Sequence, residues 1–465
     1  MNQPGRANAG HRLRQWASAL TFVALGAFGA LGCASHSDKT KEIRSALDAG
    51  NPRQALTLLN EQLDTKSEKE LPENTSGDNS LFLLDRAMVL QQLQIYKWSS
   101  RDLEVSDKQI EMLDFSRNTA HDIGKYLFSD DVGPYKAPPY EKLMINTMNM
   151  VNYLAVGDLQ GARVEARRLA VMQKYLKDHD PKNALTAPGS YLAGFTFEKS
   201  GQYEEALRYY DEALQYGEYT SLSEPVRRLM GRAGYASPRL RKIAGLGEGE
   251  QAPRATDTPG AEQGELLVIV SYGRVPAKIA RRLPIGLALT YASGALEPGA
   301  SAQANALGAQ GLVTWVNYPE LGNAHGEYDK PSFQLDGKQL PLEGIVAVDQ
   351  ETKKAWDQAK GAVIASAITR MIARVAAGKG VEAAAGNDHP IAGFLLGLAT
   401  QATLTAADTP DTRSWATLPA RMAFARVMLP AGPRTIKLRA RGADSVRKVT
   451  IKPGGFAVVN LTVLE

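Results

Sequence analysis

Residues 190–216, SYLAGFTFEKSGQYEEALRYYDEALQY, decide the fold of the N-terminal half of this chain. Small and aromatic residues recur here at the spacing of two helices joined by a turn, and Gly201 supplies the turn. Small residues let the two helices approach closely, while aromatic residues fill the angle between neighbouring pairs. One such pair cannot bury its own apolar face, so the pattern predicts stacked copies. The residues at these positions are Gly194, Gly201, Tyr203, Ala206, Tyr210 and Ala213.

Weaker copies precede this stretch, at residues 43–59, 81–106 and 141–169. The last of them holds Gly157 and Ala162 at matching offsets. Together the units resemble tetratricopeptide (TPR) repeats. The resemblance predicts an all-α, TPR-like solenoid over residues 33–245.

The second half of the chain has a different character. Residues 246–264 are rich in Gly, Pro and charged side chains, which predicts a linker. Residues 265–407 are predicted to form a mixed β/α domain, with candidate strands at 266–271, 285–291, 312–318 and 345–348 and a helix pair at 352–377 and 391–404. Residues 408–465 alternate apolar runs with turn signals and look similar to small β-sandwich-like modules of the PEGA type. The expected fold class is therefore multidomain α+β.

The nearly uncharged helix predicted at 391–404 leaves two interpretations open. It is too short to span the hydrocarbon of a bilayer, so the simpler one is a buried core helix. The sharper one is contact with a membrane or with a second copy, because Gly393 and Gly397 would allow close helix packing.

Cys33, the only cysteine, ends a signal-like N-terminal segment. A short apolar run at 16–30 follows basic residues, which is typical of a secretory signal peptide over residues 1–32. The sequence before Cys33 resembles a bacterial lipobox, and this implies lipidation of its thiol. Ala34 then favours the outer membrane, with the protein facing the periplasm. The alternative is a free or buried cysteine after an ordinary signal peptide. The basic residues of the segment are Arg6, Arg12 and Arg14.

Charge argues against nucleic acid as a partner. Residues 1–32 hold three Arg and no acidic residue, so without them the formal net charge of +4 falls to +1. Binding to nucleic acid requires a concentrated basic surface. The sequence also indicates no cofactor.

Two irregular segments hold the candidate partner-binding residues. Tyr135 and Tyr140 flank turn-forming residues in the insertion at 130–140, and Arg413 and Trp415 lie in the segment DTRSW. Tyr153, in the third repeat-like unit, completes the set. The competing interpretations are a packed connector for the insertion and a corner that leads into a strand for DTRSW.

No catalytic or metal-binding constellation stands out. There is no G-x-S-x-G elbow, no H-E-x-x-H motif and no P-loop in the sequence. The pairs at 121–122 and 178–180 could suggest an HD-type metal site, and 130–131 a cation site. Solvated helix caps and turns are the simpler interpretation, because adjacent carboxylates alone do not supply the oxygen ligands that calcium requires.

The stretches 138–168, 264–278 and 411–432 resemble a family of uncharacterised bacterial lipoproteins with TPR-like N-terminal repeats and a β-rich C-terminal domain. The resemblance covers most of the chain after residue 32. It implies an envelope lipoprotein, and no catalytic residue comes with it.

The leading hypothesis is a non-enzymatic, lipid-anchored scaffold or assembly factor of the cell envelope that binds a protein or peptide through its repeats. One alternative is an accessory or activator lipoprotein of a cell-wall synthesis or secretion machine. Another is a hydrolase with an unrecognised site. The repeat-groove hypothesis makes a structural demand, which is that the inner face of the solenoid stays open.

Overall fold

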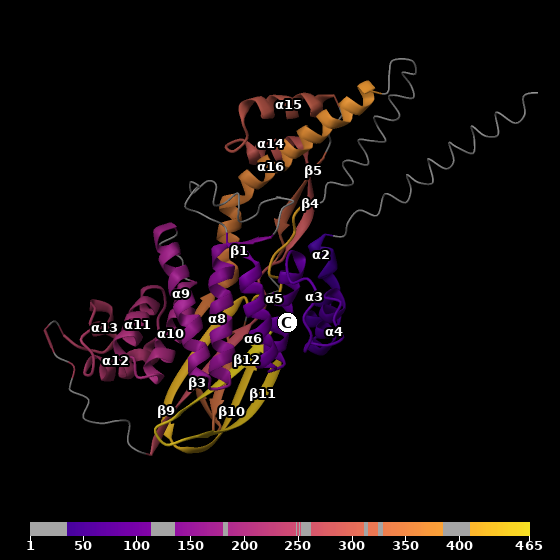
Figure 1. The fold of residues 1–465 in the computed structure, drawn as a ribbon. Helices are drawn as coiled ribbons and strands as arrows, with labels where there is room; N and C mark the ends of the chain where they lie inside the picture. Colours follow the sequence, from indigo (N-terminus) through magenta and orange to yellow (C-terminus); the bar gives the residue numbers. More distant parts are fainter. Residues whose placement is uncertain are drawn as a thin grey trace, which may run out of the picture.

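The computed structural model describes residues 35–112, 135–179, 185–247, 249–250, 252, 262–310, 315–323, 329–384 and 410–465. It has about 52% helix and 21% strand, which confirms the predicted mixed α+β class. Figure 1 shows a helical layer in front of β-sheets, with an arm of helices rising from one end.

The helical layer is built from successive helix pairs. After the short α2 (His36–Lys39), the pairs are α3 (Lys41–Asp48) with α4 (Pro52–Gln62), α5 (Asp78–Gln92) with α6 (Tyr96–Gln109), α8 (Pro139–Ala155) with α9 (Leu159–His179), and α10 (Thr186–Lys199) with α11 (Tyr203–Tyr216). The layer ends with η2 (Thr220–Leu222), α12 (Ser223–Met230) and α13 (Pro238–Ile243). These pairs lie where the sequence predicts repeats, whereas the assignment to the TPR class stays a prediction.

The turn inside each pair has the same backbone geometry. Gly50, Gln94, Gly157 and Gly201 each have a positive φ, between 62° and 77°. In each turn this residue donates its N–H to the carbonyl three residues earlier, and the next residue donates five residues back. This is the left-handed helix C-terminus that favours glycine. Gly157 and Gly201 were predicted as repeat residues, and the structure places both in these turns.

Close helix contact explains the small residues of the repeats. A Cβ atom on Gly194 would overlap the ring of Tyr210, so α10 and α11 meet at this pair. Gly161 accepts the ring of Tyr153 in the same way in the preceding pair. Ala162, Ala206 and Ala213 are fully buried, while Tyr203 is partly buried against the same core.

Behind the helices, the strands form two four-stranded sheets. Sheet one has the order β12 (Phe456–Val463), β3 (Gln263–Tyr272), β9 (Arg421–Pro430), β8 (Glu343–Ala347). Sheet two has the order β11 (Ala443–Ile451), β10 (Gly432–Ala440), β6 (Ser332–Leu335), β7 (Lys338–Leu340). β12 runs parallel to β3, and the other pairings in these sheets are antiparallel. Strands from both sides of residue 408, a boundary proposed from sequence, therefore share both sheets.

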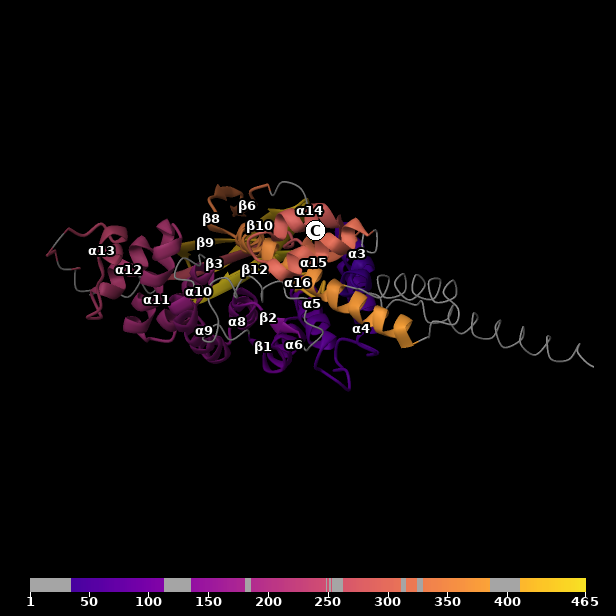
Figure 2. The same cartoon turned by 90° about the horizontal axis from the view of Figure 1, so that it is seen from above.

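Alternation along β3 divides its side chains between two cores. Leu267 and Ile269 join the core under the helices, whereas Leu266, Val268 and Val270 join the core between the two sheets. Successive side chains of a strand point to opposite faces, so sheet one is buried on both sides. The result is three layers: helices, sheet one and sheet two (Figures 1 and 2).

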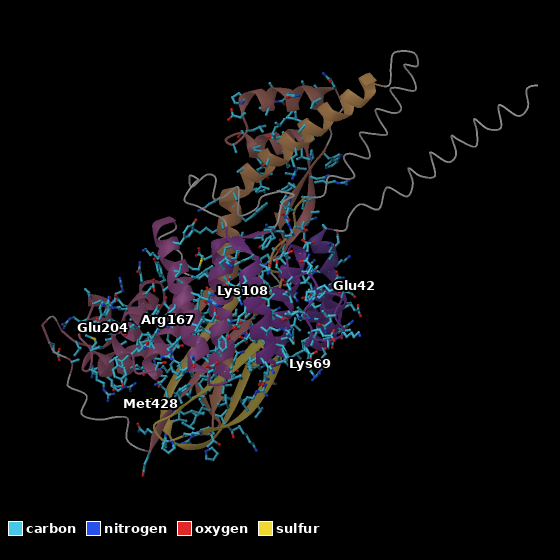
Figure 3. The ribbon with its side chains drawn as sticks, in the orientation of Figure 1. Glu42, Lys69, Lys108, Arg167, Glu204 and Met428 are labelled. Atoms are coloured by element: carbon cyan, nitrogen blue, oxygen red, sulfur yellow. The ribbon has the colours of Figure 1, made fainter. Side chains whose placement is uncertain are left out.

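The first helices of the last three pairs face sheet one. α5 and α8 contact β12, and α10 contacts β8. The ring of Tyr191 on α10 lies 4.8 Å from that of Phe424 on β9, and Phe195 lies 5.5 Å from Phe456 on β12. The second helices carry exposed charges, such as Lys108, Arg167 and Glu204, which are labelled in Figure 3.

The arm has its own apolar core. It consists of β4 (Lys278–Pro284) paired with β5 (Trp315–Leu321), the helices α14 (Ile285–Ala292) and α15 (Pro298–Ala309), and the long α16 (Val348–Ala384). The strand predicted at 285–291 is wrong, because these residues form α14. A short apolar run without charges does not distinguish a strand from a buried helix. The amphipathic helix predicted at 352–377 lies within α16.

Several sequence predictions lie outside the described residues. They are Cys33 and the signal peptide, most of the linker, the insertion before Tyr135, and the helix predicted at 391–404. Within the described part of the chain, no helix combines the length and apolar character required to cross a membrane.

Candidate functional site

Four of the predicted partner-binding residues meet around one buried carboxylate, Glu141, in the first turn of α8. The Tyr135 hydroxyl donates to Glu141 Oε2 at 2.5 Å, and the backbone N–H of Trp415 donates to its Oε1 at 3.3 Å. The Tyr140 hydroxyl also hydrogen-bonds this carboxylate. Arg413 lies above the Tyr135 ring, with its guanidinium carbon 5.9 Å from the ring centre. Sequence reasoning thus selected residues that are neighbours, although it did not foresee that Glu141 joins them.

This region, which we call the Glu141 junction, is largely buried. Trp415 is fully buried and Tyr135 is 7% exposed. Burial raises the pKa of Glu141 above its usual range, although the hydrogen bond from Tyr135 opposes this effect. The geometry supports the corner interpretation of DTRSW, because residues 411–419 lead directly into β9. Trp415 and Tyr135 are therefore placed to hold the layers together rather than to meet a partner.

Tyr153 lies elsewhere. Its hydroxyl donates a short hydrogen bond to Glu104 on α6, and its ring rests against Gly161. Burial raises the pKa of Tyr153 to about 12. This tyrosine connects the second and third helix pairs and does not join the other four residues.

The junction extends through segment 411–417 to the N-terminal helices. Thr417 donates its N–H to Asp85 Oδ1 at 3.0 Å, and Ser37 donates its N–H to Thr412 Oγ1 at 2.9 Å. Burial raises the pKa of Asp85 to about 7. Burial also lowers the pKa of His36 to about 4, and the ring of His36 stacks on Phe82 at 5.1 Å.

Some buried polar atoms of this region lack a hydrogen-bond partner in the structure. They are both ring nitrogens of His36, Oδ2 of Asp85 and the indole nitrogen of Trp415. Leaving a buried polar group unpaired costs about 1–3 kcal/mol. Not every buried polar atom at this end of the helix–sheet interface is therefore hydrogen-bonded.

A second buried polar group, the Arg426 cluster, lies at the other end of the interface. The guanidinium of Arg426 on β9 contacts both oxygens of Glu198 at 2.8 Å, and it also pairs with Glu265 on β3. Lys199 and Arg228 add further contacts to Glu198, at 3.0 and 2.9 Å. Burial opposes ionisation of Glu198, but these cations hold its pKa well below the usual range. The cluster joins α10 to two strands.

One open pocket combines polar lining with a free strand edge. It has a volume of about 540 Å³ and lies between the end of α11, η2, β8 and the start of α16. Glu218, Glu343 and Glu351 contribute carboxylates, and Ile345 contributes an apolar side chain that is 38% exposed. Among the described strands β8 pairs only with β9, so its other edge borders this pocket. We call it the β8 pocket.

Local geometry shapes the β8 pocket. Glu343 accepts hydrogen bonds from the backbone N–H of Ser221, at 3.1 and 3.2 Å, and from the hydroxyl of Thr220 at 2.7 Å. Gly344 has a φ of 62°, and a Cβ atom there would overlap the ring of Tyr219. The register with β9 shifts between Glu343 and Val346, as at a β-bulge. A glycine inside a strand often marks such a bulge, so Gly344 is the signal in the sequence that indicates this site.

In the described residues, no three His, Cys, Asp or Glu side chains group closely enough to hold a metal ion. No protein-family model matches the chain, and no curated protein matches it either. The geometry of the chain itself must therefore carry the functional argument.

Proposed function

We propose that this protein is a non-enzymatic, lipid-anchored protein of the bacterial cell envelope that binds an extended, basic peptide segment of a partner protein in the β8 pocket. The observation that carries the proposal is the free edge of β8 inside a polar pocket of about 540 Å³ that has three carboxylates in its lining. An unpaired strand edge offers backbone hydrogen bonds to an added strand, and pockets for alternate side chains give specificity.

Charge and shape select the type of peptide. Glu218 is exposed and Glu351 is half-buried, so both can meet a Lys or Arg side chain of a bound strand. Glu351 already lies 3.7 Å from Lys354, a weak contact that a peptide cation can replace. Ile345 adds apolar contact. Because β8 has five residues, the bound segment should be similarly short.

The repeats themselves do not offer the groove that the sequence hypothesis required. The faces that α5, α8 and α10 present to the strands are covered by sheet one, and α10 is buried from Thr186 to Glu198. The proposed binding site therefore lies on the sheet edge beside α11, rather than on the inner face of the helix pairs.

A binding experiment on the full chain tests the peptide site. Fluorescence anisotropy with arrayed decapeptides should identify basic, extended sequences, and acidic versions of the same sequences should fail to bind. The double variant Glu218→Lys/Glu351→Lys should weaken binding at least tenfold. The matched control Glu204→Lys/Glu205→Lys changes the charge equally on the outer face of α11 and should leave binding unchanged. Equal loss in both variants would show only a general charge effect and would contradict the proposal.

The anchor is tested separately. Growth with labelled palmitate should label the protein, and Cys33→Ser should abolish the label and release the protein from the membrane fraction. Retention of the label in Cys33→Ser would refute lipidation at this residue. Peptide binding is expected to persist in Cys33→Ser, because the β8 pocket does not include the N-terminus.

A further inference from the structure

The arm exposes large apolar side chains on a nearly uncharged helical tip. Residues 285–310, which include α14 and α15, contain one charged residue, Glu297. The exposed fractions are 43% for Leu287, 46% for Tyr291 and 50% for Trp315. These values are high for side chains of this size in a region that already has its own core.

The three side chains belong to one small area of the arm. Leu287 and Tyr291 are four residues apart on α14 and therefore lie on the same face of that helix. Trp315 begins β5 and pairs with Pro284, the residue directly before α14. The neighbouring face of α14 is used for packing, because Ala288 and Ala292 are fully buried in the arm core. The apolar core of the arm is therefore formed without the exposed side chains of Leu287, Tyr291 and Trp315.

Basic residues accompany this apolar area. The Lys360 ammonium lies 4.8 Å from the centre of the Tyr291 ring. Arg281 and Arg282 are exposed on β4, which leads to the tip. Arg281 and Lys360 both lie near Glu320 of β5, at 3.4 and 3.7 Å, so the cations here outnumber this carboxylate. Apolar and aromatic side chains beside Lys and Arg are typical of surfaces that rest in the headgroup region of an anionic bilayer.

The base of the arm lies next to the start of the folded body. α2 contacts β4, and Figure 1 shows the arm rising from the end of the body where α2 lies. Ser35, the first described residue, is two residues after Cys33. Two residues span at most about 7 Å. A lipid on Cys33 would therefore hold this end of the body, and the arm with it, close to the membrane.

We propose that the tip of the arm docks on a phospholipid bilayer, with Leu287, Tyr291 and Trp315 in the interface and the neighbouring basic side chains near anionic headgroups. The occupant is the bilayer itself, because a small set of aromatic and aliphatic side chains flanked by cations matches an interfacial surface. This inference does not depend on the β8 pocket, and it can be tested without the lipid on Cys33.

Vesicle binding of the full chain gives the test. In a Cys33→Ser background, sedimentation with phosphatidylglycerol-containing vesicles should show binding that weakens as salt increases. Adding Leu287→Ser, Tyr291→Ser and Trp315→Ser should reduce the vesicle-bound fraction at least tenfold. The matched control Val156→Ser/Val171→Ser/Val446→Ser removes three exposed apolar side chains outside the arm and should bind like the background. All variants retain the same N-terminal segment, so differences report on the arm.

Trp315 provides a second measurement that needs no disruptive variant. In a background that also carries Trp16→Phe, which removes the tryptophan of the N-terminal apolar run, brominated lipids should quench part of the tryptophan emission, and the conservative Trp315→Phe should remove most of that quenching. Equal vesicle binding by the arm variant and the control, or quenching that survives in Trp315→Phe, would overturn the proposal. Arm-dependent dimerisation in sedimentation velocity without vesicle binding would overturn it in favour of a contact between two copies.

Discussion

Two buried polar regions join the same helical layer to the same sheet, yet they are organised differently. In the Arg426 cluster, every carboxylate oxygen of Glu198 and Glu265 contacts a cation or a hydroxyl. In the Glu141 junction, His36 and the second oxygen of Asp85 have no hydrogen-bond partner. Paired charges stay ionised when buried, whereas unpaired groups shift their pKa toward the neutral form. The Arg426 cluster should therefore contribute stability that does not change with pH near neutrality, whereas the contribution of the Glu141 junction should depend on pH.

The largest effect on stability is expected from removing the central cation of the Arg426 cluster. Arg426→Leu leaves Glu198 and Glu265 buried without their main counter-ion, which should lower the free energy of unfolding by about 3–5 kcal/mol. Denaturant unfolding of the full chain measures this change. The control Arg208→Leu removes an exposed pair with Glu204 and should cost under about 1 kcal/mol. A similar small cost at Arg426 would show that the two regions do not differ as described.

The next effect concerns Asp85. Its pKa rises from 3.8 to about 7 on folding, so the folded state holds a proton that the unfolded state has lost between these values. Stability contributed by this group therefore decreases as pH rises from about 4 to 7. Asp85→Asn keeps an oxygen to accept the N–H of Thr417, and it should stabilise the protein by about 2–4 kcal/mol at pH 8 and little at pH 4. Unfolding free energies at the two pH values decide this prediction, and an equal effect at both would refute it.

His36 should show the opposite pH dependence. Its pKa falls from 6.5 to about 4 on folding, so between these pH values the unfolded state is protonated at His36 and the folded state is not. Stability contributed by this group is lost as pH decreases through that window. His36→Phe keeps the stacking on Phe82 and should remove a loss of about 2–3 kcal/mol near pH 4. Because Asp85 and His36 act in opposite directions, their two contributions to the pH dependence of stability should largely cancel between about pH 4 and 6.5. Unfolding free energies of His36→Phe and of the unsubstituted protein at about pH 4 and about pH 7 measure the His36 effect, and an equal difference at both would refute it.

The smallest effect tests the turns that join paired helices. Gly201 donates its N–H to the carbonyl of Glu198, so its turn positions one end of the Arg426 cluster. Gly201→Ala should destabilise by about 1 kcal/mol, because alanine disfavours a positive φ. At the equivalent turn Gln94 already has a φ of 62°, and Gln94→Gly should instead stabilise by about 0.5–1 kcal/mol. Thermal unfolding of both variants measures the contrast, and a shift in the same direction for both would refute it.

Local patterns were sufficient to place the helix pairs. Gly201 and Gly157 predict turns because few other residues accept their backbone angles, and Gly194 predicts close contact because it has no side chain. The order of the sheets was not predictable in this way, since β3 lies between β9 and β12, which come about 150 and about 190 residues later, and pairing over such separations leaves no periodic signal. Glu141 was missed because a lone carboxylate at a helix start has the appearance of a solvated cap. The β8 pocket depends on a bulge, and a bulge can be recognised only when the pairing of β8 with β9 is known.

The position of β12 also has a consequence for how the chain matures during synthesis. The helical layer emerges from the ribosome long before β9 and β12, yet Phe424, Phe456 and Leu464 belong to its apolar core or pack against it. Until those strands arrive, the inner faces of α5, α8 and α10 lack their cover and are open to aggregation. We therefore expect the nascent protein to depend on holding chaperones, and chains that terminate before β9 should be degraded rather than accumulate as a free helical domain.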